Sequence, residues 1–300
     1  MLLLLFLVRS SAGAFQQQLR RRLPYSRRCW TSRRYFASPT TTTTTNTIQN
    51  ATDEDASTTA TTCATTTVLD DDDAAIRAQT LRWVKDVVIG LQLCPFASAP
   101  LLAGRLHVRV VRTMQQQQDV VETELQHAME HLQQQQQGGT TLVVCPDLFP
   151  NDFDAFWTQV VQPLETEWLV QQGWEGIFQL APFHPQFRFA GSSSSDDDDE
   201  NSPDQFTNRS PYPMLHVLRE ADVTRAVADL RTTTNDDTTT TTITDPSYAV
   251  WSRNVDLLRT LADELTPEEF TAVVTACRRR RPVLRDKVRS ILQRFRCSKE

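Results

Sequence analysis

The chain has 300 residues, of which 39% are hydrophobic and 23% charged, and its formal net charge is −6 at pH 7. This length allows one or two domains, and an acidic balance argues against a general nucleic-acid binder, whose footprint is a basic face. The sequence contains no G-x-G-x-x-G, Walker A, H-E-x-x-H or G-x-S-x-G motif, so we expect no nucleotide chemistry and predict no cofactor.

The N-terminal residues have the composition of a targeting leader. Eight arginines and no lysine precede the first acidic residue, Asp53. The apolar run Leu2–Val8 is far shorter than the ~20 residues of a membrane-spanning helix, and Ala12-Gly13-Ala14 offers a small-residue cleavage site before Phe15. This arrangement resembles the bipartite leader of algal complex plastids. We predict that residues 1–36 are a cleaved leader for the plastid, with a mitochondrial presequence as the alternative.

Removal of the leader makes the protein more acidic. Taking eight from the 31 basic residues leaves 23 against 37 acidic residues, a net charge near −14. Residues 37–73, rich in Thr and Asp, lack apolar periodicity and are predicted to be a disordered linker. The folded region is expected from residue 74, where apolar residues at three- and four-residue steps predict a helix that ends before Pro95.

Strands and helices then alternate. Residues 106–111, 141–145 and 176–181 have the composition of strands, and residues 120–132 and 153–169 the periodicity of helices. Short connections between such elements imply right-handed crossovers. We therefore predict one α/β domain over residues 74–265, with a small parallel or mixed sheet of about three to four strands flanked by helices.

The second half of the domain is interrupted twice. Residues 192–205 and 232–244 are polar, low-complexity insertions, and the intervening Pro213–Leu230 and the later Ala249–Leu265 are predicted helices. Residues 266–300 are predicted to form a basic amphipathic C-terminal helix. We do not expect nucleic acid as a partner, and this helix is its one candidate contact; the alternatives are a membrane or protein contact, or a helix docked on the acidic body.

The six cysteines form no C-x-x-C pair, so zinc ribbons and thioredoxin-type dithiols are not indicated. Cys94, before Pro95, is a candidate nucleophile, although a helix C-terminus disfavours a thiolate and a small buried residue is the alternative. Cys145, which ends a hydrophobic strand, is expected in the core.

Ligands of open parallel sheets bind beyond the carboxyl ends of the strands. Those ends carry Arg112, Thr113, Cys145 and the Phe183-His184 turn. His184, on a loop between prolines and aromatics, is a candidate acid/base group; the alternative is a partly buried histidine that caps a turn.

The second candidate segment is Asn208-Arg209-Ser210. With Ser210 as N-cap and Pro211 as the first residue of the predicted helix, the free amides and Arg209 would form a site for phosphate or carboxylate. The alternative is an ordinary cap with a surface arginine.

His216 and Glu220 would share a face of that helix, with Arg219 beside them. Such a pair could orient a histidine base or supply metal ligands, or it could be a structural hydrogen bond. Arg188, on the other side of the polar insertion, is a further candidate anion ligand. A metal site would require Cys94, His184, His216 and Glu220 to converge; we predict no metal.

Three motifs resemble a known family. They are Gly90-Leu-Gln-Leu-Cys-Pro-Phe96, Phe183-His-Pro-Gln-Phe187 with Phe189-Ala-Gly191, and Asn208-Arg-Ser-Pro-Tyr-Pro-Met-Leu-His216 with Leu218-Arg-Glu220. They are similar to the "domain of unknown function 1415" family, over about Leu81 to Leu261. The resemblance implies a fold and a pocket, and it implies no reaction.

The sequence therefore predicts an organellar α/β enzyme or binding domain for a small anionic metabolite. His184, His216 and Cys94 are its candidate catalytic residues, and its candidate binding residues are Asn208, Arg209, Ser210, Arg219, Glu220 and Arg188. The alternative is a non-catalytic accessory protein in which these polar motifs are structural.

Overall fold

A four-stranded mixed sheet organises the computed structural model, which describes residues 62–113, 118–135, 138–188, 202–233, 246–276 and 282–297. Its strands are β1 (Leu106–Val110), β2 (Thr140–Val144), β3 (Phe178–Phe183) and β4 (Met214–Arg219), in the order β1-β2-β4-β3. β1 and β2 are parallel, and β4 is antiparallel to both β2 and β3. The first three strands therefore run in one direction, which confirms the predicted α/β class with a mixed sheet.

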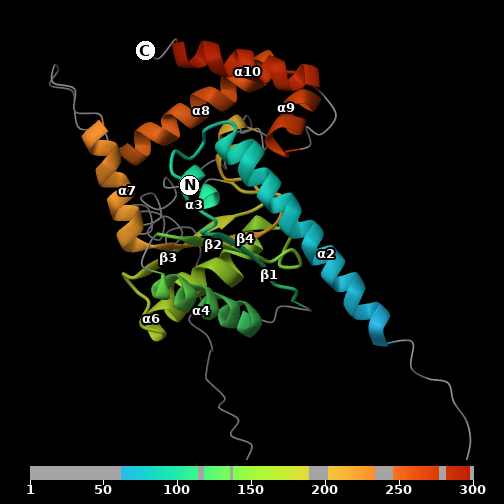
Figure 1. Ribbon diagram of the computed structural model, residues 1–300, viewed down its shortest axis with the longest axis vertical. Helices are drawn as coiled ribbons and strands as arrows, with labels where there is room; N and C mark the ends of the chain where they lie inside the picture. The colour runs from blue at the N-terminus through green and yellow to red at the C-terminus, as the bar shows by residue number, and fades with distance from the viewer. Residues whose placement is uncertain are drawn as a thin grey trace, which may run out of the picture.

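Two hydrophobic layers cover the sheet, one on each face (Figure 1). The helical layer on one face comprises α4 (Gln118–Gln134) and the irregular run α5 (Phe153–Phe156), η2 (Trp157–Val161), η3 (Leu164–Trp168) and α6 (Leu169–Gln171). The other face is covered by α2 (Thr62–Trp83), η1 (Val84–Ile89), α8 (Pro246–Glu264), α9 (Pro267–Val274) and α10 (Pro282–Cys297). Both sides of the strand β2 are thus buried, as its near-continuous apolar sequence predicts.

The remaining elements are short or peripheral: α3 (Ser98–Leu102), the 3₁₀ helix η4 (Pro203–Thr207) and α7 (Glu220–Thr233). None of the described helices combines the length and apolar character needed to cross a bilayer. The predicted leader 1–36, most of the linker 37–73, and most of both insertions lie outside the described residues. α2 begins at Thr62, inside the predicted linker, and the predicted C-terminal helix is divided into α9 and α10.

The helix predicted over Pro213–Leu230 is wrong in its first half. Met214–Arg219 is the strand β4, and a helix begins only at Glu220. β4 pairs with a strand on each side, so both edges of its backbone are hydrogen-bonded, and Met214 to Val217 are buried. A short apolar run does not distinguish a central strand from a helix, and here the pairing with two neighbours decides.

Candidate functional site

The carboxyl edge of the sheet brings together three of the predicted segments. β1, β2 and β3 end there, so Arg112, Cys145 and His184 follow the strands at this edge. Because β4 runs the opposite way, the residues just before it, Asn208–Pro213, reach the same edge; we call them the strap. The geometry that topology predicted for the strand ends is therefore present.

The strap is fixed to the strand ends by backbone hydrogen bonds. His184 N donates to Asn208 O and Ser210 N donates to His184 O, each at 3.4 Å, and Cys145 N donates to Pro213 O at 2.9 Å. The Ser210 hydroxyl donates to Tyr212 O at 2.6 Å. No helix starts at Ser210, so the predicted N-cap and the anion site at a helix N-terminus are wrong; Ser210 closes a turn instead.

His184 is a buried, fully hydrogen-bonded residue of this edge. Its Nε2 lies 2.8 Å from Phe149 O, and its Nδ1 accepts from Gln186 N at 3.0 Å. The ring stacks on Phe156 at a centroid distance of 5.4 Å, and burial lowers its pKa despite the opposing effect of the Phe149 carbonyl. With one nitrogen donating and the other accepting, neither is available for proton transfer in this arrangement.

Asn208 differs from His184 because its side chain is not satisfied. Asn208 is 4% exposed, and its Nδ2 has no hydrogen-bond partner in the described part of the chain. A buried donor without a partner costs about 1–3 kcal/mol. The guanidinium of the next residue in the chain, Arg209, lies 4.5 Å from the centre of the Phe206 ring. The strap thus contains a buried amide donor without a partner among the described residues, and a cationic residue follows it in sequence.

A second polar cluster at the carboxyl edge is centred on Arg112. Its Nε lies 3.0 Å from Asp73 Oδ1 and its Nη1 3.2 Å from Asp147 Oδ1, and the hydrogen bond to Asp73 raises the Arg112 pKa. Nearby, the Tyr212 hydroxyl donates to Gln79 Oε1 at 2.7 Å. The sequence placed Arg112 at the edge but did not indicate these partners. Asp73 and Gln79 are on α2, whose position across the sheet is a distant contact, and Asp147 is in the loop after β2.

His216 lies inside the sheet on the face opposite His184. In register it stands between Leu142 and Ala181, whose side chains belong to the layer of α2 and α8. His184 instead contacts Phe153 and Phe156, which belong to the layer of α4 and α6. The two candidate catalytic histidines therefore do not share a pocket.

The His216 ring is held in its neutral form. Complete burial lowers its pKa to about 3. Nε2 is hydrogen-bonded to the Thr140 hydroxyl, and that hydroxyl donates to Val217 O at 2.9 Å. The Thr140 oxygen must therefore accept from His216, which assigns the proton to Nε2. Nδ1 is left buried without a partner among the described residues.

Arg219 and Glu220 lie at the other edge of the sheet. Arg219 Nη1 donates to Gln135 O at 3.1 Å, and its Nε is 3.1 Å from Asp222 Oδ2, close enough for an ion pair but not aligned for a hydrogen bond. Glu220 N donates to Ile177 O at 2.9 Å and begins α7. Since His216 is in a strand, the predicted helical pairing with Glu220 is wrong, and Arg219 is remote from the strap.

The last two candidates, Arg188 and Cys94, make contacts within the fold. Arg188 follows β3 and pairs with Asp154 at 2.9 Å in a largely exposed ion pair. Cys94 is 5% exposed and lies in a turn that α8 fastens through a hydrogen bond from Asn254 Nδ2 to Leu93 O at 2.7 Å. Cys145 lies in the core as expected, with 0% of its surface exposed, and this burial raises the pKa of its thiol to about 12.

The described residues contain no group of three or more His, Cys, Asp and Glu side chains placed to hold a metal ion. The proposed four-residue metal site fails on geometry, since His184 and His216 occupy opposite faces of the sheet.

Comparison with known proteins identifies one relationship. A family model described as "Protein of unknown function (DUF1415)" matches residues 75–265. No curated protein and no solved structure matched the chain. The matched segment contains the whole sheet, the strap and α8, and it ends before α9 and α10.

Proposed function

The chain belongs to this family of unknown function, and we propose that it binds a small anionic molecule at the strap. The supporting observation is the buried Nδ2 of Asn208, which has no partner among the described residues; Arg209 follows it directly in the chain. An acceptor from a ligand would satisfy this donor. The neighbouring guanidinium favours a carboxylate or phosphate over a neutral acceptor, because charge-assisted hydrogen bonds are about twice as strong as neutral ones.

Binding without histidine catalysis fits the protonation of the two histidines. His184 uses both ring nitrogens on backbone atoms, those of Phe149 and Gln186, and His216 is uncharged and fully enclosed. In this proposal His184 positions the strap through its backbone N and O, and Asn208 and Arg209 contact the ligand. Arg219 and Arg188 take no part, because each is paired away from the strap.

Titration of the full chain with phosphate and with malonate, followed by calorimetry, tests the proposal. Asn208→Ala and Arg209→Gln should each weaken binding by at least about tenfold, as expected for a charge-assisted hydrogen bond. Arg188→Gln is the matched control, since it removes the same charge from an exposed ion pair, and it should bind as wild type. Binding of neither anion, or equal loss in all three variants, would refute a strap site.

A second candidate, a non-catalytic accessory protein, is favoured by one observation. Two polar side chains of the segment that the family model matches bond to backbone atoms: His184 to Phe149 O and Gln186 N, and Asn254 to Leu93 O. In that case wild type would bind neither anion, and Arg209→Gln would lower the melting temperature, because it removes the contact of Arg209 with the Phe206 ring. Melting temperatures recorded beside the titration separate the two functions.

We also propose that residues 1–36 direct the protein to the plastid, with the mitochondrion as the alternative compartment. The basis is the acid-free, arginine-rich composition behind a short apolar run. A fluorescent fusion of the full chain, compared with one that begins at residue 37, tests this. Equal distribution of the two fusions would contradict a leader.

A further inference from the structure

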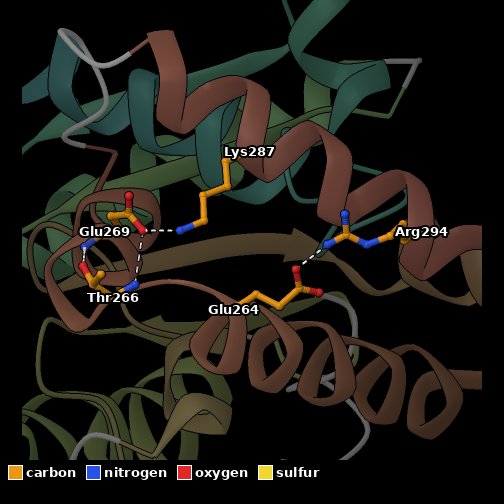
Figure 2. Close-up of polar contacts among 5 residues, drawn as sticks. All are labelled: Glu264, Thr266, Glu269, Lys287 and Arg294. Carbon is orange, nitrogen blue, oxygen red and sulfur yellow. Dashed lines mark hydrogen bonds and ion pairs between the residues drawn. The ribbon is translucent and has the colours of Figure 1, made fainter.

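α10 packs through one apolar face and forms ion pairs along one flank. Its apolar side chains Leu284, Val288, Ile291 and Phe295 are buried. On the flank drawn in Figure 2, Lys287 Nζ lies 2.7 Å from Glu269 Oε2, and Arg294 pairs with Glu264 at the end of α8. Glu269 also completes the capping box of α9 with Thr266. The cations of this flank are therefore neutralised within the fold.

The opposite flank presents arginines to solvent. Arg285, Arg289 and Arg296, here called the arginine stripe, are spaced i, i+4 and i+11 and so lie within about 40° of each other around the helix. All three are exposed. Among the described residues Arg289 pairs with Asp286 of the same helix, at 3.1 Å, and it is 71% exposed, so the pair contributes little. No recorded ion pair among the described residues includes Arg285 or Arg296.

Positive charge is concentrated at the C-terminal end of the stripe. Arg253 of α8 is half-buried beneath it, 5.9 Å from the centre of the Phe295 ring, and donates to Gln92 O and Asn254 Oδ1. Burial lowers the pKa of Arg253, and the charge of Arg296 lowers it further. Two guanidinium groups thus repel each other here, and a bound anion would relieve that repulsion.

We propose that the arginine stripe is a docking surface for an acidic segment of a partner protein. The stripe extends about 16 Å along the helix, from eleven residues at 1.5 Å each, which matches a few carboxylates on a helix or strand. Guanidinium groups pair with carboxylates in bidentate geometry. A long polyanion would extend past the stripe over a chain whose net charge is −6, so RNA and anionic membranes fit less well.

The stripe lies on α10, outside the residues that the family model matches, which end at Leu265. The strap lies within them, so an experiment can contradict either binding proposal without contradicting the other.

Fluorescence anisotropy on the full chain tests the proposal. The probe is a labelled helical peptide with glutamates at i, i+4 and i+11, and its glutamine counterpart is the negative control. Replacing the stripe (Arg285→Gln, Arg289→Gln and Arg296→Gln together) should weaken peptide binding by about tenfold. The effect should shrink as salt is raised. The matched control Arg77→Gln, Lys85→Gln and Arg225→Gln removes the same charge from exposed positions elsewhere and should bind as wild type.

Competition with single-stranded RNA and with phosphatidylglycerol-containing vesicles separates the classes of partner. Weaker binding of both than of the acidic peptide supports the proposal. Tighter binding of RNA or vesicles, lost in the stripe variant, would assign the surface to a different partner and overturn it. So would peptide binding that is absent, or equally reduced in both triple variants. Circular dichroism melting of the stripe variant checks that α10 stays docked.

Discussion

Asn254 Nδ2 donates a hydrogen bond to the carbonyl oxygen of Leu93 at 2.7 Å, and this joins α8 to the turn that follows η1. Gln92 has a positive φ of 57°, which ends the helical path. Carbonyls at the end of η1 accept from the turn itself, for example Val87 O from Leu91 N and Val88 O from Leu93 N. α8 supplies donors for the next two carbonyls of the turn: Arg253 to Gln92 O at 3.0 Å and Asn254 to Leu93 O. An asparagine of one helix thus fastens the turn that follows another.

We predict that Asn254→Ala lowers the free energy of unfolding by about 1–3 kcal/mol, because it leaves the Leu93 carbonyl buried without a donor. Urea denaturation measures the change. Asn254→Asp keeps the shape but replaces the NH₂ donor with an acceptor, so it should cost at least as much. Losses below about 0.5 kcal/mol for both variants would contradict this role.

The strands before the strap were predictable because each carries its own local signal. β1, β2 and β3 are short β-rich runs separated by helical periodicity, and their order alone implied that Arg112, Cys145 and His184 would follow strands at one edge. The helix predicted from Ala249 was also confirmed, as α8 from Pro246 to Glu264. These assignments need no knowledge of distant contacts.

The sequence-based predictions were wrong where contacts between distant residues decide the secondary structure. Met214–Arg219 is a strand because β2 and β3 lie on either side of it, which the sequence around Pro213 does not reveal. That error placed His216 and Glu220 on one helix, whereas His216 lies in β4 and Glu220 begins α7. His184 and His216 lie on opposite faces of the sheet. The sequence also did not predict that Arg112 pairs with Asp73 and Asp147.

The buried His216 predicts that acid destabilises the fold. Its folded pKa, about 3, lies below the unfolded value of 6.5. The unfolded chain therefore binds the proton more readily, and stability present above pH 6.5 is lost as the pH falls toward 3. Between pH 7 and pH 5 this residue alone should remove about 2 kcal/mol. His184, whose pKa is also lowered, contributes in the same direction.

Urea denaturation at pH 7 and pH 5, for wild type and for His216→Leu, measures this effect. Leucine cannot titrate, and Thr140 keeps its hydrogen bond to Val217 O, so the variant should lose about 2 kcal/mol less than wild type over the same interval. An identical pH dependence in both proteins would show that His216 does not titrate on unfolding.

For α10 we predict that its apolar face, and not its ion pairs, holds it on the fold. Ile291 is 1% exposed, and truncation of such a side chain costs about 2–5 kcal/mol. Lys287 and Arg294 are 41% and 58% exposed in their ion pairs, and exposed pairs contribute about 0–1 kcal/mol each. Ile291→Ala should therefore destabilise more than Lys287→Gln and Arg294→Gln combined. Thermal unfolding measures this order, and its reversal would contradict the assignment.

For Gly90→Ala the direction of the change in stability is the test. Its backbone is helical, with φ −62° and ψ −33°, so alanine would ordinarily stabilise this position by about 0.4–1 kcal/mol. Gly90 N, however, donates to Lys85 O at 3.0 Å in the wider π-helical turn, and a Cβ at Gly90 would lie 2.3 Å from Asp86 O. Because the obstacle is backbone, relief requires η1 to shift, and we expect Gly90→Ala to cost about 1–3 kcal/mol.

Gly173→Ala is the matched control for this substitution. Gly173 has a φ of +72° and open space where the Cβ would be placed, so its cost of about 1–2 kcal/mol should come from the left-handed backbone alone. Amide exchange across Val84–Ile89 should rise in Gly90→Ala and stay unchanged in Gly173→Ala, since only the first forces the π turns of η1 apart. A stabilised Gly90→Ala protein would mean that η1 relaxes to an ordinary α-helix, and with it the turn that Asn254 fastens would have to move.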